Sequence, residues 1–121
     1  MVNKVTYTNR KTIMIGQDSY YIALPIVVSG TANTTIKAGE PLKGNIQKRD
    51  TAFTASTTGA VGINLHDVEL DANGKGNATL VIAGCVDLLK LDSTVKANVT
   101  TALADEGQAL DRIIFVEGSA I

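Results

Sequence analysis

The chain has 121 residues and a formal net charge of -1, and 45% of its residues are hydrophobic while only 4% are aromatic. This length suits one domain, with enough apolar residues for a core without a metal or a disulfide. The near-neutral charge argues against nucleic-acid binding, which needs a basic stripe. No apolar run approaches the ~20 residues that span a bilayer. We therefore expect neither a nucleic acid nor a membrane as a partner.

The cellular compartment follows from cysteine content and from the first residues. The single cysteine excludes an internal disulfide. The opening "MVNKVTYTNR" lacks the apolar segment of a signal peptide. We therefore expect the protein to be made and used in a reducing cytoplasm.

The first 19 residues are polar and rich in Thr, and only "TIMIG" at 12–16 interrupts this pattern. They contain too little apolar surface to offset an ordering cost of ~1–2 kcal/mol per residue. The composition therefore predicts a flexible N-terminal arm at 1–19 that a partner orders, followed by a β-rich domain at 20–121.

The next apolar run, "YYIALPIVVSG" at 20–30, alternates with period two and predicts a strand. One face carries Tyr20, Ile22, Leu24, Ile26 and Val28. Pro25 has no N–H, so the run is either an edge strand or two strand pieces. The following "TIKAGEPLKG" predicts a strand, a tight turn at Ala38–Gly39 and a short strand with Leu42 pointing inward. A polar loop comes next, with a possible short strand in "AFTAS".

The stretch "GINLHDVELDANGKGNATLVIAGCV" at 62–86 is predicted to be a hairpin. The apolar alternation changes phase at His66–Asp67, which is typical of a β-bulge with one extra residue. The second arm is apolar on both faces, so it is predicted to be a central strand covered on both sides. If Leu70 faces Asn77, His66 lies opposite Val81.

Helical spacing appears after residue 91, where Val95, Val99, Ala102 and Leu103 recur on one face. Asp92 or Ser93 can cap the start of this helix, and Gly107 can end it. The closing "DRIIFVEG" at 111–118 predicts a final strand.

The candidate chemical groups do not form a convincing catalytic site. Cys85, His66 and Asp67 are suitable residue types for a nucleophile, a base and an orienting group. The hairpin register, however, separates His66 from Cys85 by about four residues, roughly 13 Å at ~3.3 Å per residue, where a working pair needs about 3 Å. "DANGKG" lacks the further ligands of a calcium loop and is predicted to be a turn. One histidine and one cysteine make a protein-only zinc site improbable. We therefore expect no enzyme activity, no cofactor and no metal.

The order of short motifs resembles the head decoration proteins of lambda-like tailed phages, from about Thr31 to Val116. The resemblance lies in an "AGxxLK"-like turn, a "GIxxxDV"-like strand, and a strand that ends in "GxVxxxxL". The matching residues are Ala38, Gly39, Leu42, Lys43, Gly62, Ile63, Asp67, Val68, Gly84, Val86 and Leu91.

This resemblance implies a small, mainly β, single-domain fold that is β-barrel-like (β-tulip-like), with one short C-terminal helix. It also implies a homotrimer on the outside of an expanded phage head, with a non-catalytic role and an N-terminal arm that orders against the major capsid protein. The protein would then be a virion component, made in the bacterial cytoplasm, that stabilises the head against internal DNA pressure.

The capsid contacts are predicted to come from the apolar and aromatic side chains of the arm and its junction with the domain. These are Val5, Tyr7, Ile13, Ile15, Tyr20 and Tyr21. The Thr, Val, Tyr and Ile content of the arm suits addition of a strand to a partner, and Tyr is enriched at interface cores. Two alternatives remain: another virion component, such as a head fibre base or a tail-tube module, and a β-barrel that binds a small ligand.

Overall fold

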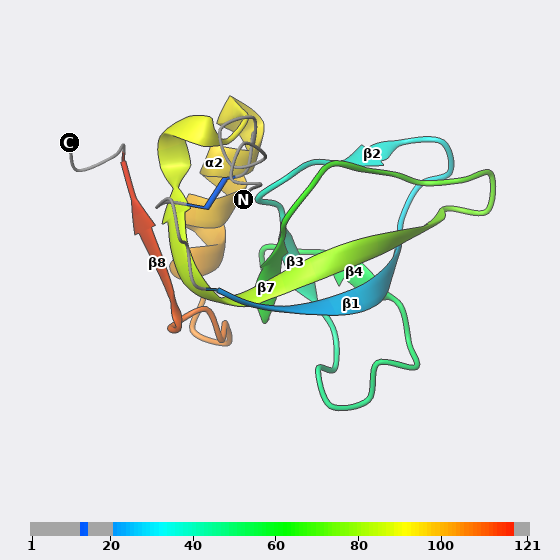
Figure 1. The fold of residues 1–121 in the computed structure, drawn as a ribbon, viewed down its shortest axis with the longest axis horizontal. Helices are drawn as coiled ribbons and strands as arrows, with labels where there is room; N and C mark the ends of the chain where they lie inside the picture. The colour runs from blue at the N-terminus through cyan, green and yellow to red at the C-terminus, as the bar shows by residue number, and fades with distance from the viewer. Residues whose placement is uncertain (1–12, 15–20, 118–121) are drawn as a thin grey trace, which may run out of the picture.

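A computed structural model describes residues 13–14 and 21–117, and its ribbon is shown in Figure 1. In chain order the strands are β1 (Ile22–Ser29), β2 (Thr35–Ile36), β3 (Pro41–Lys43), β4 (Phe53–Ala55), β5 (Gly62–Asn64), β6 (Val68–Glu69), β7 (Lys75–Asp87) and β8 (Ile113–Val116). Between β7 and β8 lie a 3₁₀ turn, η1 (Leu88–Lys90), and the helix α2 (Ser93–Leu103).

Five strands close into a barrel in the order β1-β4-β3-β5-β7, because β1 also pairs with β7. A sixth strand, β8, lies beside β7 in parallel, while β2 and β6 form a separate two-stranded ribbon. The expected fold class is thereby confirmed as mainly β, with a closed five-stranded barrel and one short C-terminal helix.

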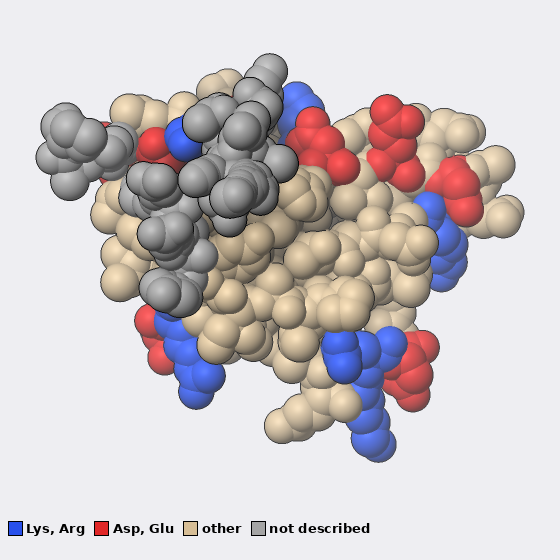
Figure 2. All heavy atoms as spheres, in the orientation of Figure 1, with Lys and Arg blue, Asp and Glu red and all other residues tan. Residues whose placement is uncertain are grey.

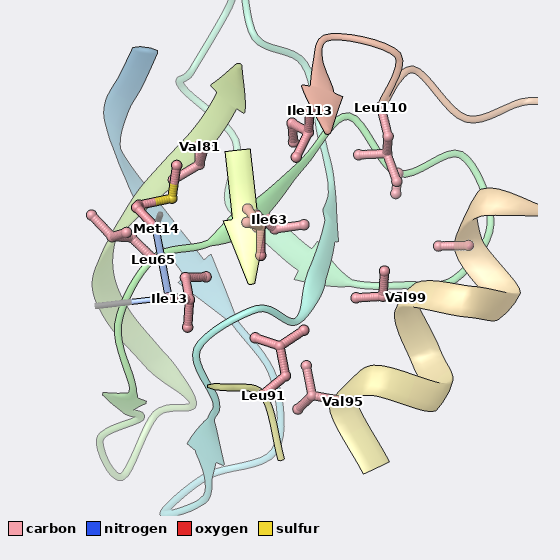
Figure 3. Close-up of a cluster of buried hydrophobic side chains, with 13 residues drawn as sticks. Ile13, Met14, Ile63, Leu65, Val81, Leu91, Val95, Val99, Leu110 and Ile113 are labelled. Atoms are coloured by element: carbon pink, nitrogen blue, oxygen red, sulfur yellow. The ribbon is translucent and has the colours of Figure 1, made fainter. Parts of the chain in front are cut away.

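The apolar side chains form two clusters. The first lies between the barrel strands and the β2–β6 ribbon, and consists of Ile26, Val28, Ile36, Leu42, Phe53, Val68, Leu70, Ala78 and Leu80. The second lies where β5, β7 and β8 meet α2, and Figure 3 shows most of its members. Leu42 is fully buried as predicted. Separating the core into two clusters lets one long strand, β7, serve both.

The strand β1 is continuous through Pro25, because the strand pairs with β7 along its whole length and Pro25 has no partner in β4 on the other edge. All eight residues pair with β7, whereas β4 pairs only with Val28 and Ser29. The Pro25 carbonyl accepts a hydrogen bond from Nη1 of Arg49 at 3.2 Å, so it points away from β7. In an antiparallel ladder the N and O atoms of one residue point the same way. The missing N–H of Pro25 therefore removes no hydrogen bond to β7.

The predicted hairpin forms, but its register differs from the prediction. β7 is central, as predicted, and Val81 lies opposite Ile63 rather than His66. The strand pairing is interrupted at His66–Asp67, and the interruption is larger than a one-residue bulge. Leu65 and Asp71 are six residues apart in sequence. Their hydrogen-bond partners on β7, Thr79 and Lys75, are only four residues apart. The two extra residues arise because β6 leaves β7 and pairs with β2.

The helix α2 begins as predicted, with Asp92 as its N-cap accepting a hydrogen bond from the Thr94 N–H at 3.0 Å. Val95, Val99 and Ala102 face the second cluster, while 39% of Leu103 remains exposed. The helix ends at Leu103, four residues before the predicted stop at Gly107. The predicted final strand is present as β8.

The prediction that residues 1–19 form an arm is wrong at positions 13 and 14. Ile13 and Met14 are each 2% exposed and lie in the second apolar cluster among Ile63, Leu65 and Val81 (Figure 3). Met14 forms a β-bridge to Val86, and the Ile13 carbonyl accepts a hydrogen bond from the Asp87 N–H at 2.9 Å. An apolar pair next to an open edge of β7 gains more from burial than its ordering costs.

Candidate binding surfaces

One candidate surface is the outward face of the paired strands β1 and β7. No Asp, Glu, Lys or Arg occurs from Ser19 to Ile36 or from Gly76 to Val86, so both strands are uncharged between their ends. Inward side chains of β1 fill the first cluster, and the outward ones include the exposed Pro25 and Val27. Figure 2 shows this face as a neutral area with charged side chains at its margins. We call it the neutral face.

A neutral face of this kind is typical of a contact with another protein. Exposed apolar side chains scattered singly need no explanation, but contiguous ones mark interaction sites. Charged residues are depleted at the centre of protein–protein interfaces. Val27 is 43% exposed, and the exposed Pro25 lies two residues away on the same face of β1. The neutral face therefore has the composition expected of an interface core.

Gly84 of β7 lies at the end of the neutral face where β1 begins. A Cβ atom built on Gly84 would lie 2.7 Å from Met14 Cε and 2.8 Å from Tyr21 Cβ. The φ angle of this glycine is +142°, in a region that residues with a side chain rarely adopt. The glycine therefore lets residues 14 and 21 approach β7 closely. The sequence signal for this docking was the short apolar run "TIMIG" in an otherwise polar segment.

The predicted capsid-contact residues fall into three groups. Tyr21 is 41% exposed at the start of β1, where a partner can reach it. Ile13 is 2% exposed in the core, so its side chain is not available to a partner while the segment is docked. Val5, Tyr7, Ile15 and Tyr20 lie outside the described residues.

One buried polar side chain that the sequence analysis missed holds the turn between β2 and β3. Asn64 is 0% exposed, and its Nδ2 donates to the carbonyls of Ile36 and Lys37 at 3.1 Å, and to that of His66. Its main chain also pairs with this turn, through Gly39 N–H and the Glu40 carbonyl. Within the described structure its Oδ1 has no hydrogen-bond partner. Asn64 thus fixes the "AGEPLK" turn against β5, and only its place between the apolar residues Ile63 and Leu65 could have signalled this.

An open groove of about 520 Å³ lies where the ends of β1, β2 and β4 meet the turn before β7. Most of its polar lining consists of hydroxyl groups, from Ser29, Thr31, Thr34, Thr35 and Thr54. Ile36 and Leu70 supply apolar surface. None of its lining residues is aromatic. Small-molecule pockets are usually lined by hydrophobic and aromatic groups, so the groove has only part of that character.

The residues considered for chemistry do not come together. Cys85 lies opposite Ile114 of β8, whereas His66 lies in the bend after β5. The "DANGKG" segment is a turn, as predicted: Asp71 Oδ1 accepts from the Asn73 and Lys75 N–H groups at 2.8 and 3.0 Å. These two hydrogen bonds lower the pKa of Asp71 below its ordinary value of 3.8. Within this turn only Gly74 has a positive φ.

Neither a metal site nor a membrane span is found in the part of the chain that the structure describes. Across residues 13–14 and 21–117, His, Cys, Asp and Glu form no group of three or more that could hold a metal ion. None of the helices described there is long and apolar enough to cross a membrane. The chain matches no protein-family model and no curated protein sequence.

Proposed function

We propose that this chain is a structural decoration protein of a tailed phage. In this role it binds the outside of the expanded head as a homotrimer and stabilises the capsid against the pressure of packaged DNA. The neutral face of β1 and β7 is the single observation that supports this role best, because its composition is that of a protein contact. The resemblance of the short motifs to lambda-like decoration proteins supplies the identity of the partner, the major capsid protein.

The physical basis of stabilisation is linkage. A subunit that binds across a joint between capsid proteins, and only while the joint is closed, adds its binding free energy to the cost of opening. Three identical copies held in one body bind multivalently, so weak single contacts sum to a stable attachment. A rigid closed barrel suits such a role, because little binding energy is lost in ordering it.

In this proposal the neutral face and the N-terminal residues act together. Tyr21 precedes β1 and is 41% exposed, so its side chain can join a contact made by the neutral face. Residues 1–12 then supply an extended strand to the capsid protein, with Ile13 and Met14 anchoring it to β7. No catalytic step, cofactor or metal is part of this proposal.

The decisive experiment is binding to expanded, undecorated heads of the phage whose genome carries the gene. The intact chain should co-sediment with these heads and lower DNA release on heating. Val27→Lys, which places a charge on the neutral face, should abolish binding, while Leu89→Lys, at an exposed apolar site away from that face, should not. Equal binding by both variants would show that the neutral face is not the contact. A gene neighbourhood without head genes would refute the proposal.

A second candidate function is suggested by the hydroxyl-lined groove, namely binding of a small polar ligand. A thermal-shift screen with sugars, nucleotides and metal ions tests this cheaply. A saturable stabilisation above about 1 kcal/mol would support it, since a bound ligand stabilises the native state by mass action.

A further inference from the structure

The strand β8 has one unused edge. It stands last in the six-stranded sheet, and among residues 13–14 and 21–117 it pairs only with β7 (Figure 1). Its two inward side chains, Ile113 and Phe115, pack on the second apolar cluster. The N–H and C=O groups on its other edge face away from the sheet. A strand edge of this kind is a template for pairing with another chain.

The pairing with β7 identifies which backbone groups are unused. The Gly84 N–H donates to the Arg112 carbonyl at 3.1 Å, so residue 112 points toward β7. Backbone groups alternate between the two edges of a strand. Residues 113, 115 and 117 therefore point outward. The Ile113 N–H is already bound to the Leu110 carbonyl at 3.0 Å. The unused groups are then the Ile113 carbonyl, both groups of Phe115 and the Glu117 N–H.

The outward side chains of β8 are apolar, and the strand has no charged residue or proline that would hinder association. Ile114 is 63% exposed, and Val116 is partly exposed on the same face. From Ile113 to Val116 the strand has no charged residue and no proline, the features with which edge strands usually prevent association. The cross-strand neighbour of Ile114 is Cys85, a small and partly exposed side chain. The edge and its outer face are therefore both suited to a partner strand.

We propose that the free edge of β8 pairs antiparallel with β8 of a second copy of this chain, centred on Phe115. Two copies related by a twofold axis perpendicular to the sheet must pair one residue with itself. Centred on Phe115, each Phe115 N–H reaches the other copy's Phe115 carbonyl, and each Glu117 N–H reaches an Ile113 carbonyl. Ile114 then lies opposite Val116 of the second copy, so the outer faces join two apolar pairs.

The alternative register, centred on Ile114, is disfavoured by both hydrogen bonding and charge. It would place Asp111 opposite Glu117 twice, and like charges directly opposite each other destabilise a sheet. It would also leave the Phe115 carbonyl without a partner, because the Ile113 N–H opposite it is already bound to the Leu110 carbonyl. The self-complementarity of the edge therefore selects both the occupant, a second copy, and the register.

This contact is independent of the proposed function, since it requires no head and no capsid protein. In a shell of trimers it would join neighbouring copies across twofold axes, on an edge that the neutral face of β1 and β7 leaves free. Failure of one proposal leaves the other standing, because self-association and head binding are measured separately.

Disulfide trapping tests the register directly in the full chain with Cys85→Ser. The double variant Ile114→Cys/Val116→Cys places cysteines at a non-hydrogen-bonded pair, with Cα atoms ~4.5 Å apart, within the range that a disulfide spans. The single variant Ile114→Cys leaves its two copies diagonal at ~7–8 Å, too far to link. We expect at least about fivefold more covalent dimer from the double variant. Efficient linking of the single variant, or of neither, overturns the proposal.

Sedimentation equilibrium supplies an independent test with a matched control. Ile114→Lys places a charge against the apolar pair and should raise the dissociation constant of the β8 contact about tenfold or more. Leu89→Lys changes an equally exposed side chain, also 63%, on η1 and should leave it within about twofold. Equal self-association by both variants overturns the proposal. Head binding by Ile114→Lys then reports separately on the proposed function.

Discussion

Replacing Met14 by alanine tests whether the N-terminal residues belong to the folded body. Met14 is 2% exposed, bridges Val86 and packs among the side chains of the second apolar cluster. A flexible tether at this position would tolerate alanine without loss. A core residue would not, because truncation removes buried methylene groups and leaves a cavity.

The expected loss can be bounded from the structure. Truncation of a buried Met, Leu or Ile to Ala typically costs about 2–5 kcal/mol. The docked segment can also be released from β7, which would avoid the cavity and limit the loss to the docking free energy. Two buried side chains and the hydrogen bond from the Asp87 N–H to the Ile13 carbonyl hold it. We therefore expect a loss of about 2–3 kcal/mol, in the lower part of that range.

Urea unfolding of the full chain, with and without Met14→Ala, measures this loss as a change in midpoint at constant slope. Leu89→Ala is the control, since 63% of Leu89 is exposed, and its effect should stay within about 0.5 kcal/mol. Hydrogen exchange at the Asp87 amide should accelerate only in Met14→Ala, because release of the segment exposes it. A loss below about 0.5 kcal/mol with unchanged exchange at Asp87 would refute the assignment of residues 13 and 14 to the core.

Three further predictions follow from single contacts. Gly84→Ala should destabilise the protein by about 2–4 kcal/mol, because residue 84 has a positive φ and the added methyl group would clash with Met14 and Tyr21. In the double variant with Met14→Ala, the loss of stability should be smaller than the sum of the two single losses. Strict additivity of the two losses would contradict the clash. Asn64→Asp would bury a carboxylate facing three carbonyls, so its stability relative to the parent should recover as pH falls and the acid becomes neutral; a pH-independent loss would count against this. The pKa of Asp92 is lowered below 3.8 by hydrogen bonds from the Thr94 N–H and Lys37, so Asp92→Asn should cost stability at neutral pH. That difference should vanish as pH falls through the folded-state pKa, and an unchanged difference in acid would disprove it.

Local patterns predicted the elements whose form depends on near neighbours. The cap at Asp92 and the apolar spacing of Val95, Val99 and Ala102 placed α2 correctly at its start. The turn at Asp71 followed from residues that hydrogen-bond to their own backbone. The end of α2 was misplaced, because Gly107 is a possible stop but the apolar face already ends at Ala102. These successes and this error all concern interactions within about four residues.

Long-range pairings needed the tertiary structure. Alternation predicted β5 and β7, yet the opposition of Ile63 and Val81 depended on β6 leaving the hairpin for β2. The candidate binding surface was equally hidden: the two uncharged stretches are visible in the sequence, but only the pairing of β1 with β7 makes them one face.

The amino-acid sequence by itself determined that the chain is small and β-rich, with a central apolar strand and a capped helix. Tertiary structure alone decided that the barrel closes, that Ile13 and Met14 join the core, and that β8 keeps a free edge. The physical reason is that burial and hydrogen-bond satisfaction are summed over segments far apart in the chain, while a sequence pattern reports only the preferences of each segment.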